Sequence, residues 1–77
     1  IYPGENVIYG SAGDTVSLIP LSGSAGGVRT EKLYYPLLDE TLIFGPARGV
    51  SNVMMAESAR VWLRDGLLLV VHTIGRA

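Results

Sequence analysis

Hydrophobic and polar residues alternate along short stretches of this chain, and a two-residue period is typical of strands that bury one face. The clearest stretch of the first half covers residues 14–21. Its apolar face carries Val16 and Leu18, while Thr15 and Ser17 lie on the other face. The pattern therefore predicts a half-buried strand at this point.

The alternation returns at residues 59–64, where Val61 and Leu63 belong to the apolar face. The dipeptide Asp65-Gly66 follows, and it is the strongest hairpin signal in the chain because Asp-Gly suits a two-residue turn. The apolar run at residues 67–71 would then return as the partner strand. This part of the sequence predicts a β-hairpin.

The hairpin prediction fixes a register and, through it, a prediction about assembly. The expected pairs are Arg64 with Leu67, Leu63 with Leu68, Trp62 with Leu69, Val61 with Val70 and Arg60 with Val71. One face of this hairpin is a core face, but the other sets Trp62 among leucine and valine side chains. A lone small sandwich covers one face, so we expect the hairpin to lie at an interface with another subunit or domain.

Pro and Gly residues interrupt the middle of the chain. Residues 33–38 are rich in Tyr and Leu, but Pro36 removes one ladder donor, so this stretch suits an edge strand or a bent connection. Residues 41–44 predict a second short extended piece. The pairs Gly45-Pro46 and Arg48-Gly49 then mark turns through which no regular element continues.

No stretch has the period of a long amphipathic helix, and residues 53–58 have room for one helical turn at most. Short extended pieces recur instead, including residues 6–9 and residues 28–30, with Gly-rich turns between them. The predicted fold class is therefore all-β, as a β-sandwich or a jelly-roll-like barrel of short antiparallel strands.

The chain has 77 residues, enough for one domain with a modest core. It contains no cysteine, so it has neither disulfides nor thiolate chemistry, and a reducing cytoplasm is a compatible location. A formal net charge of −1 gives no basic footprint for nucleic acid or a membrane surface. The longest apolar run is far below the ~20 residues that span a bilayer. Because the chain begins at Ile1, we expect a fragment of a longer protein.

The polar residues form no evident catalytic or metal-binding set. Residues 22–27 lack the Lys and Ser/Thr of a phosphate-binding loop and precede no helix, so a turn is expected. His72 is the only histidine and ends an apolar strand, where a packing or capping role fits it. Asp39 and Glu40 point apart and are expected to be solvated. Arg48 is expected to lie at the surface.

One part of the chain carries chemistry suited to a ligand. Tyr35 and the Ser51-Asn52 pair lie on either side of the Gly- and Pro-rich turns. An aromatic face can stack on a flat, nitrogen-rich ring, while a hydroxyl and a carboxamide recognise its donors and acceptors. The alternative is that Tyr35 packs in the core and that Ser51-Asn52 belongs to a turn.

Four blocks of sequence follow one another along nearly the whole chain. They are GDTVSLIPLSG at residues 13–23, VRTEKLYYPLLDETLIFG at residues 28–45, GVSN at residues 49–52 and GLLLVVH at residues 66–72. In this order and spacing, the blocks resemble the C-terminal, thiamin-binding domain of bacterial thiamin pyrophosphokinases.

The resemblance implies an enzyme that transfers pyrophosphate from ATP to the hydroxyethyl group of thiamin, giving thiamin diphosphate. In this family ATP and Mg²⁺ bind to an N-terminal α/β domain, while the β domain supplies much of the thiamin pocket and of the homodimer contact. Residues 1–77 would then be the thiamin-binding domain alone, without that N-terminal domain and without activity of its own. The alternative is a non-catalytic β-sandwich that serves as an oligomerisation or adaptor module.

Carried over by position, the resemblance implies that Tyr35 stacks on the thiamin ring and that Ser51 and Asn52 lie near its pyrimidine. Thr30 matches a recurrent Thr of the family and would have a supporting role. Lys32 stands where the family usually has Gly. If that position needs a positive φ, the lysine strains the backbone by roughly 1 kcal/mol.

Overall fold

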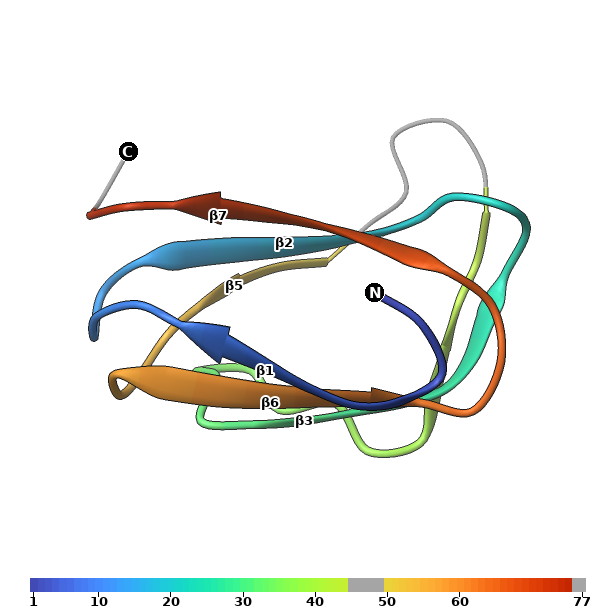
Figure 1. Ribbon diagram of the computed structural model, residues 1–77, viewed down its shortest axis with the longest axis horizontal. Helices are drawn as coiled ribbons and strands as arrows, with labels where there is room; N and C mark the ends of the chain where they lie inside the picture. The colour runs from blue at the N-terminus through green and yellow to red at the C-terminus, as the bar shows by residue number, and fades with distance from the viewer. Residues whose placement is uncertain (45–49, 76–77) are drawn as a thin grey trace.

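The computed structural model describes residues 1–44 and 50–75, and these form two antiparallel sheets that stack face to face (Figure 1). The strands are β1 (Gly4–Tyr9), β2 (Thr15–Pro20), β3 (Ala25–Glu31), β4 (Glu40–Leu42), β5 (Val50–Val53), β6 (Ser58–Leu63) and β7 (Leu68–Thr73). Within the described ranges there is no helix, and so none that is long and apolar enough to cross a membrane. The predicted all-β sandwich of short antiparallel strands is confirmed.

The two sheets differ in size and are built from strands that are distant in the sequence. One sheet has four strands in the order β1-β6-β3-β4, and the other has three in the order β5-β2-β7. The chain crosses from one sheet to the other at every connection except that between β3 and β4. Such crossings are usual in Greek-key and jelly-roll sandwiches.

The core fills the space between the sheets, and its apolar side chains come from alternate strand positions. Val16 and Leu18 of β2 are fully buried, and so are Ala59 and Val61 of β6. The alternation in the sequence therefore identified the buried faces of these two strands correctly. Among the residues whose burial the structure describes, the other buried apolar ones are Ala25, Val28, Leu33, Leu42, Met54, Leu63 and Leu68.

The prediction that Asp65-Gly66 closes a hairpin is wrong. β6 pairs with β1 and β3, whereas β7 lies in the other sheet and pairs with β2. Asp65 instead joins β3, because the Gly26 N–H donates to the Asp65 carbonyl at 3.0 Å and to its carboxylate at 3.2 Å. Gly66 has a φ of 99°, and a Cβ there would lie 2.7 Å from the Cα of Ala25. The glycine therefore allows a close crossing between the sheets instead of a hairpin turn.

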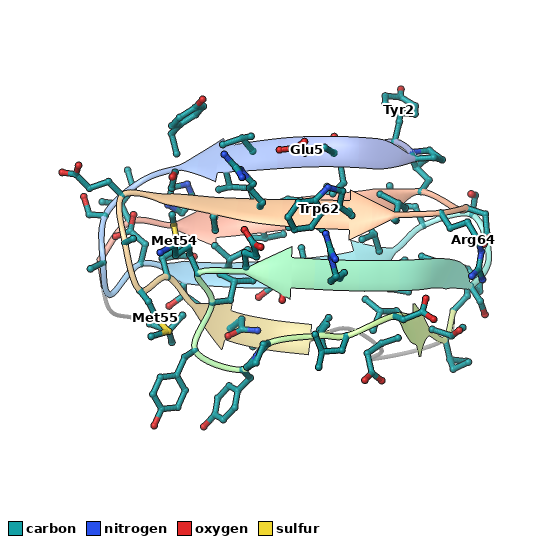
Figure 2. All side chains as sticks on the ribbon, turned by 90° about the horizontal axis from the view of Figure 1, so that it is seen from below. Tyr2, Glu5, Met54, Met55, Trp62 and Arg64 are labelled. Atoms are coloured by element: carbon teal, nitrogen blue, oxygen red, sulfur yellow. The ribbon has the colours of Figure 1, made fainter. Side chains whose placement is uncertain are left out.

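This change of partner separates two residues that the hairpin would have placed together. Trp62 lies on the outer face of the four-stranded sheet, where the Arg29 guanidinium carbon is 4.2 Å from its ring centroid (Figure 2). Leu69 lies opposite Ile19 on the outer face of the three-stranded sheet. The apolar hairpin face expected from the sequence does not exist. The predicted interface with another subunit or domain therefore cannot be argued from that face.

The middle of the chain is a bent connection between β3 and β4 and not an edge strand. Within it, Leu33 forms an isolated antiparallel bridge with Met54. Residues 53–58, which had room for one helical turn at most, form none, because Val53 still belongs to β5 and Met54 continues to pair. The turns at residues 45–49 lie outside the described residues.

The Gly-rich residues 22–27 form a turn at their start and a bulged strand at their end. β3 begins at Ala25, and its pairing with β4 shifts register between Ala25 and Val28. Gly27, with a φ of 64°, lies in this bulge, and a Cβ there would lie 2.7 Å from the Cβ of Arg64. Its lack of a side chain allows β3 to pack closely against the end of β6.

Candidate functional site

The side chain of Asn52 holds the bent connection between β3 and β4 in place. Asn52 is 1% exposed and lies opposite Val16, so β5 directs it to the interior. Its Oδ1 accepts a hydrogen bond from the Tyr35 N–H at 2.8 Å, and its Nδ2 donates to the Tyr35 carbonyl at 2.6 Å. The carboxamide therefore pairs with Tyr35 as a neighbouring strand would. We call this pairing the Asn52 clamp.

A second buried side chain holds the same connection two residues later. Thr30 of β3 is buried, and its Oγ1 accepts a hydrogen bond from the Leu37 N–H at 2.9 Å. The Thr30 N–H in turn donates to the Leu37 carbonyl at 3.0 Å. Pro36, between the two anchored residues, has a fixed φ and no N–H to satisfy. The backbone of residues 35–37 is therefore fixed at both ends.

The residues before Tyr35 are tied to β5 and its continuation. The Tyr34 N–H donates to the Val53 carbonyl at 2.8 Å, and the Met55 N–H donates to the Lys32 carbonyl at 2.9 Å. Lys32 adopts a φ of 67°, a conformation that favours glycine. Strain at Lys32 was predicted for the case that this position has a positive φ, and the structure shows that it does.

This fixed backbone presents two aromatic side chains to solvent. Tyr34 is 60% exposed and Tyr35 is 61% exposed. Their ring centroids lie 4.7 Å apart, and the ring planes meet at 87° in an edge-to-face arrangement. Met55 adds an exposed apolar side chain and lies near one end of the sandwich (Figure 2). Aromatic rings on a preformed surface are typical of ligand sites, because they offer large contact areas at a low entropy cost.

The structure brings together Thr30, Tyr35 and Asn52 from the set predicted to bind a substrate, but it turns Ser51 away from them. Ser51 lies on the outer face of β5, where its Oγ is 3.3 Å from the Oγ of Ser17. Adjacent strand residues point to opposite faces, so Ser51 and Asn52 face in opposite directions. The Ser-Asn pair is therefore divided between the surface and the interior.

Tyr34 is an exposed aromatic residue of this site that the sequence reasoning missed. The aromatic residue predicted from the sequence to bind a ligand was Tyr35, without Tyr34. The two adjacent tyrosines could have indicated this exposure, because a stretch that precedes Pro36 is too irregular to bury both side chains.

A second polar network lies where the β1–β2 turn meets the end of β7. The buried Asp14 carboxylate accepts hydrogen bonds from the Ser11 N–H at 3.0 Å and from the Gly75 N–H at 2.8 Å. The Nε2 of His72 lies 2.7 Å from the Asp14 Oδ2. The Gly75 hydrogen bond, followed by that with His72, lowers the pKa of Asp14. We call this network the Asp14 clamp, and it ties the C-terminal strand to the turn.

The remaining candidate residues form no further cluster in the part of the chain that the structure describes. Across residues 1–44 and 50–75, no three His, Asp or Glu side chains gather as metal ligands would. The carboxylate of Asp39 lies 3.8 Å from the guanidinium of Arg64, and both side chains are exposed. Arg48 lies outside the described residues.

Comparison with known proteins identifies relatives of this domain. The family described as "Thiamin pyrophosphokinase, vitamin B1 binding domain" matches residues 5–68. The crystal structure of thiamin pyrophosphokinase from Geobacillus thermodenitrificans is similar, with a TM-score of 0.84 at 23% identity. That of thiamine pyrophosphokinase from Bacillus subtilis has a TM-score of 0.83 at 21% identity. No curated protein sequence matches the chain.

The two solved structures are much longer than this chain. The matches cover 94% and 96% of this chain but 34% and 35% of the other two, about a third of their length. At these identities the likeness shows the fold. The family match extends from β1 to the start of β7 and so includes most of the chain. The chain therefore belongs to the family of vitamin B1 binding domains of thiamin pyrophosphokinase.

Proposed function

We propose that this domain binds thiamin for a pyrophosphokinase that transfers the pyrophosphate group of ATP to the hydroxyethyl oxygen of thiamin, producing thiamin diphosphate. The observation that carries the proposal is the ring of Tyr35, 61% exposed on a backbone that the Asn52 clamp holds at both its N–H and its carbonyl. Such a ring is a preorganised stacking platform for an aminopyrimidine. Family membership favours this function over that of a non-catalytic adaptor module.

We assign different roles to the four site residues. Tyr35 stacks on the aminopyrimidine ring of thiamin. The Asn52 carboxamide already bonds to Tyr35 twice and Thr30 already bonds to Leu37, so these two residues act on the ligand by positioning the loop. The Ser51 hydroxyl is exposed and retains hydrogen-bonding capacity beyond its contact with another serine. Because Ser51 lies on the opposite face of β5 from Asn52, we assign it to the proposed contact between two copies described below and not to a ligand stacked on Tyr35.

The phosphoryl chemistry belongs, in this proposal, to a second domain. The chain spans 34% and 35% of the two solved enzymes. Its described residues bring together no carboxylates that would hold Mg²⁺. We therefore assign ATP and Mg²⁺ to an N-terminal α/β domain of a cytoplasmic parent protein, a location that the lack of cysteine allows. The purified chain alone should transfer no pyrophosphate from ATP to thiamin, and turnover by it would contradict this division.

The outer face of the three-stranded sheet is the proposed contact between two copies of the protein. The described side chains of this face carry no charge; they are Thr15, Ser17, Ile19, Ser51, Val53, Leu69, Val71 and Thr73. Leu69 and Val71 are each 43% exposed. An uncharged sheet face with exposed leucine and valine side chains is typical of a protein interface, and two identical faces pair through a two-fold axis.

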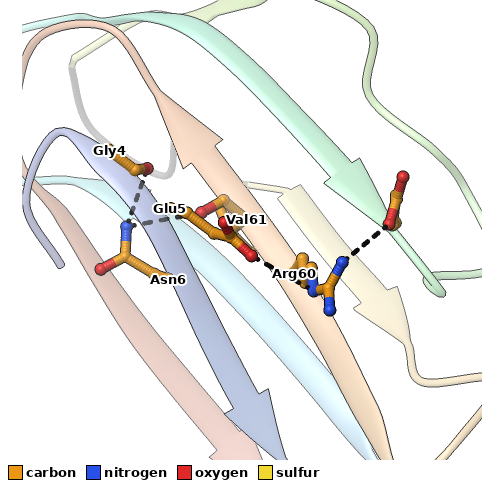
Figure 3. A network of polar contacts seen from close by, with 6 residues as sticks. Gly4, Glu5, Asn6, Arg60 and Val61 are labelled. Atoms are coloured by element: carbon orange, nitrogen blue, oxygen red, sulfur yellow. Dashed lines mark hydrogen bonds and ion pairs between the residues drawn. The ribbon is translucent and has the colours of Figure 1, made fainter.

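Charged side chains cover the outer face of the four-stranded sheet instead. The Nε of Arg60 lies 3.3 Å from the Oε2 of Glu5, and its Nη1 lies 4.0 Å from the Oε1 of Glu31 (Figure 3). Arg29 covers the ring of Trp62 on the same face. Exposed ion pairs contribute about 0–1 kcal/mol each to stability. They keep the face hydrated, so we expect it to remain in solvent.

Matched charge substitutions test this assignment of the two faces. Leu69 and Val7 are similarly exposed, at 43% and 40%, on the two different sheets. In sedimentation experiments on the parent protein, Leu69→Glu should shift a dimer towards monomer, because pairing would bury an unpaired charge. Val7→Glu, opposite Arg60 on β6, should leave the dimer intact. A wild-type protein that is monomeric at high concentration would count against the contact.

Calorimetric titration of thiamin into the parent protein tests the main proposal. Base–aromatic stacking contributes about 1–3 kcal/mol, so Tyr35→Ala should weaken binding by roughly ten- to a hundredfold. Tyr35→Trp should retain the affinity, because the larger ring keeps a stacking face. Tyr9→Ala, which removes a 76% exposed tyrosine from β1, is the matched control. If folded Tyr35→Ala binds thiamin as the wild type does, the assigned site is wrong.

A further inference from the structure

Tyr34 is an exposed ring on a backbone that the fold holds firmly. Its N–H donates to the Val53 carbonyl at 2.8 Å, and the preceding residue, Leu33, is buried and bridged to Met54. The side chain nevertheless remains 60% exposed. The fold therefore anchors the residue without burying its ring, and the roles assigned above leave that ring unused. An aromatic side chain that is fixed but uncovered is a candidate contact for a ligand.

The two tyrosines are placed together by the bend in the chain. In a regular strand, adjacent side chains would point to opposite faces. Here the ring centroids of Tyr34 and Tyr35 lie 4.7 Å apart, and the ring planes meet at 87°. Because both rings are more than half exposed, the pair offers solvent two aromatic surfaces in nearly perpendicular orientations. We call Tyr34 and Tyr35 the tyrosine pair.

The chemistry of thiamin matches these two surfaces. Its two rings are joined through one methylene carbon, so they are not coplanar and cannot both stack on a single flat surface. The aminopyrimidine is neutral, whereas the thiazolium ring carries a permanent positive charge. The face of a tyrosine ring is electron-rich and attracts a cation placed over it. One aromatic surface therefore suits each ring of the ligand.

We propose that Tyr34 is a second aromatic contact of the thiamin site and that its ring face binds the thiazolium cation while Tyr35 stacks on the aminopyrimidine. This inference rests on the proposed function. The tyrosine pair would then determine specificity, since the ring face of Tyr34 selects a ligand with a cationic second ring over one with a neutral ring of the same shape.

The test compares thiamin with a neutral analogue in which a carbon atom replaces the charged ring nitrogen. Calorimetric titration is carried out on the parent protein and its Tyr34→Leu and Tyr34→Phe variants. Tyr34→Leu keeps apolar bulk but loses the π face, so it should weaken thiamin binding by about 2- to 30-fold. It should leave the affinity for the neutral analogue within about twofold of wild type. Tyr34→Phe keeps the ring face and should bind thiamin as the wild type does.

Two controls make every outcome decisive. Tyr9→Leu removes an exposed tyrosine from β1 and should change neither affinity. If Tyr34→Leu weakens thiamin and the neutral analogue equally, or weakens neither, the inference is wrong. Tyr35→Ala then shows whether the larger proposal fails with it. Loss of binding in that variant leaves thiamin as the ligand, while unchanged binding rejects the proposed function as well.

Discussion

The Asn52 clamp and the Asp14 clamp both hold irregular backbone with one buried polar side chain, but their chemistry differs. The Asn52 carboxamide is neutral and pairs with both the N–H and the carbonyl of Tyr35. The Asp14 carboxylate is charged and accepts the N–H groups of Ser11 and Gly75. A carboxamide offers a donor and an acceptor, so it can replace a neighbouring strand, whereas an ionised carboxylate collects donors alone.

The two clamps are connected through Met54. The Met54 N–H donates to the Asp14 carbonyl at 2.8 Å, and the residue also bridges to Leu33 at the start of the tyrosine-bearing connection. The connection that carries the tyrosine pair is held by the side chains of Asn52 and Thr30, which do not titrate. The C-terminal strand is held by one that does. Acid should release the C-terminal end before it disturbs the hydrogen bonds of Tyr35.

The largest effect is expected when the neutral clamp is removed. Asn52→Ala leaves the N–H and the carbonyl of Tyr35 without their partner, at a cost of about 1–3 kcal/mol for each buried group that stays unpaired. Denaturant unfolding should show the loss of stability, and hydrogen exchange should show loosening at residues 34–37. Ser51→Ala, one position away on the outer face of β5, is the control and should unfold close to wild type. Equal stability of the two variants would mean that the clamp contributes little.

Asn52→Asp should destabilise the protein less in acid than at neutral pH, because a protonated carboxyl still accepts from the Tyr35 N–H and also donates to the Tyr35 carbonyl. The second oxygen replaces a donor and faces the Tyr35 carbonyl, 2.6 Å from the present amide nitrogen. Protonation restores a donor at that position, so the pKa of the introduced carboxyl should be raised in the folded protein. A raised pKa contributes stability at low pH that is lost as the pH rises through it. Stability that does not improve on acidification relative to Asn52→Ala would contradict this geometry.

Asp14→Asn tests the charged clamp, and its pH dependence should have the opposite sign. The pKa of Asp14 is lowered by the hydrogen bonds from Gly75 and with His72, so the folded state favours the ionised form. Its contribution is fully present above the ordinary aspartate pKa near 4 and is lost as the pH falls through the lower, folded pKa. Asp14→Asn should therefore be less stable than wild type at neutral pH and should approach it in acid. Parallel curves of unfolding free energy against pH would show that the carboxylate does not titrate differently on folding.

The buried faces of the strands could be predicted from the sequence, because alternation is a local property. Val16 and Leu18 of β2 illustrate this success. The partner of a strand could not be predicted in the same way. Asp65-Gly66 is a favourable sequence for a hairpin turn. In the structure, however, the Asp65 oxygens accept hydrogen bonds from the N–H of Gly26, 39 positions away, and this places Asp65 beside β3. A local turn signal does not reveal such a distant competitor.

The positions of the candidate site residues were predictable to a similar degree. The pattern identified an aromatic residue, Tyr35, near a polar pair, Ser51-Asn52. It did not predict that Asn52 would bond to the backbone of Tyr35, because that contact joins residues 17 positions apart and depends on how β3 and β5 are placed. It also did not predict the exposed ring of Tyr34. Residue chemistry is local, whereas the direction of a side chain depends on strand register.

The smallest expected change is a gain in stability at the start of the tyrosine-bearing connection. Lys32 has a φ of 67°, and its carbonyl is held by the Met55 N–H. A left-handed conformation costs a residue with a Cβ roughly 1–2 kcal/mol, and the greater freedom of glycine in the unfolded chain offsets part of this. Lys32→Gly should therefore raise the free energy of unfolding by about 1 kcal/mol in denaturant titrations. Lys32→Ala retains the Cβ and should give no comparable gain. If both variants gain equally, the lysine side chain and not its backbone conformation is the source of the cost.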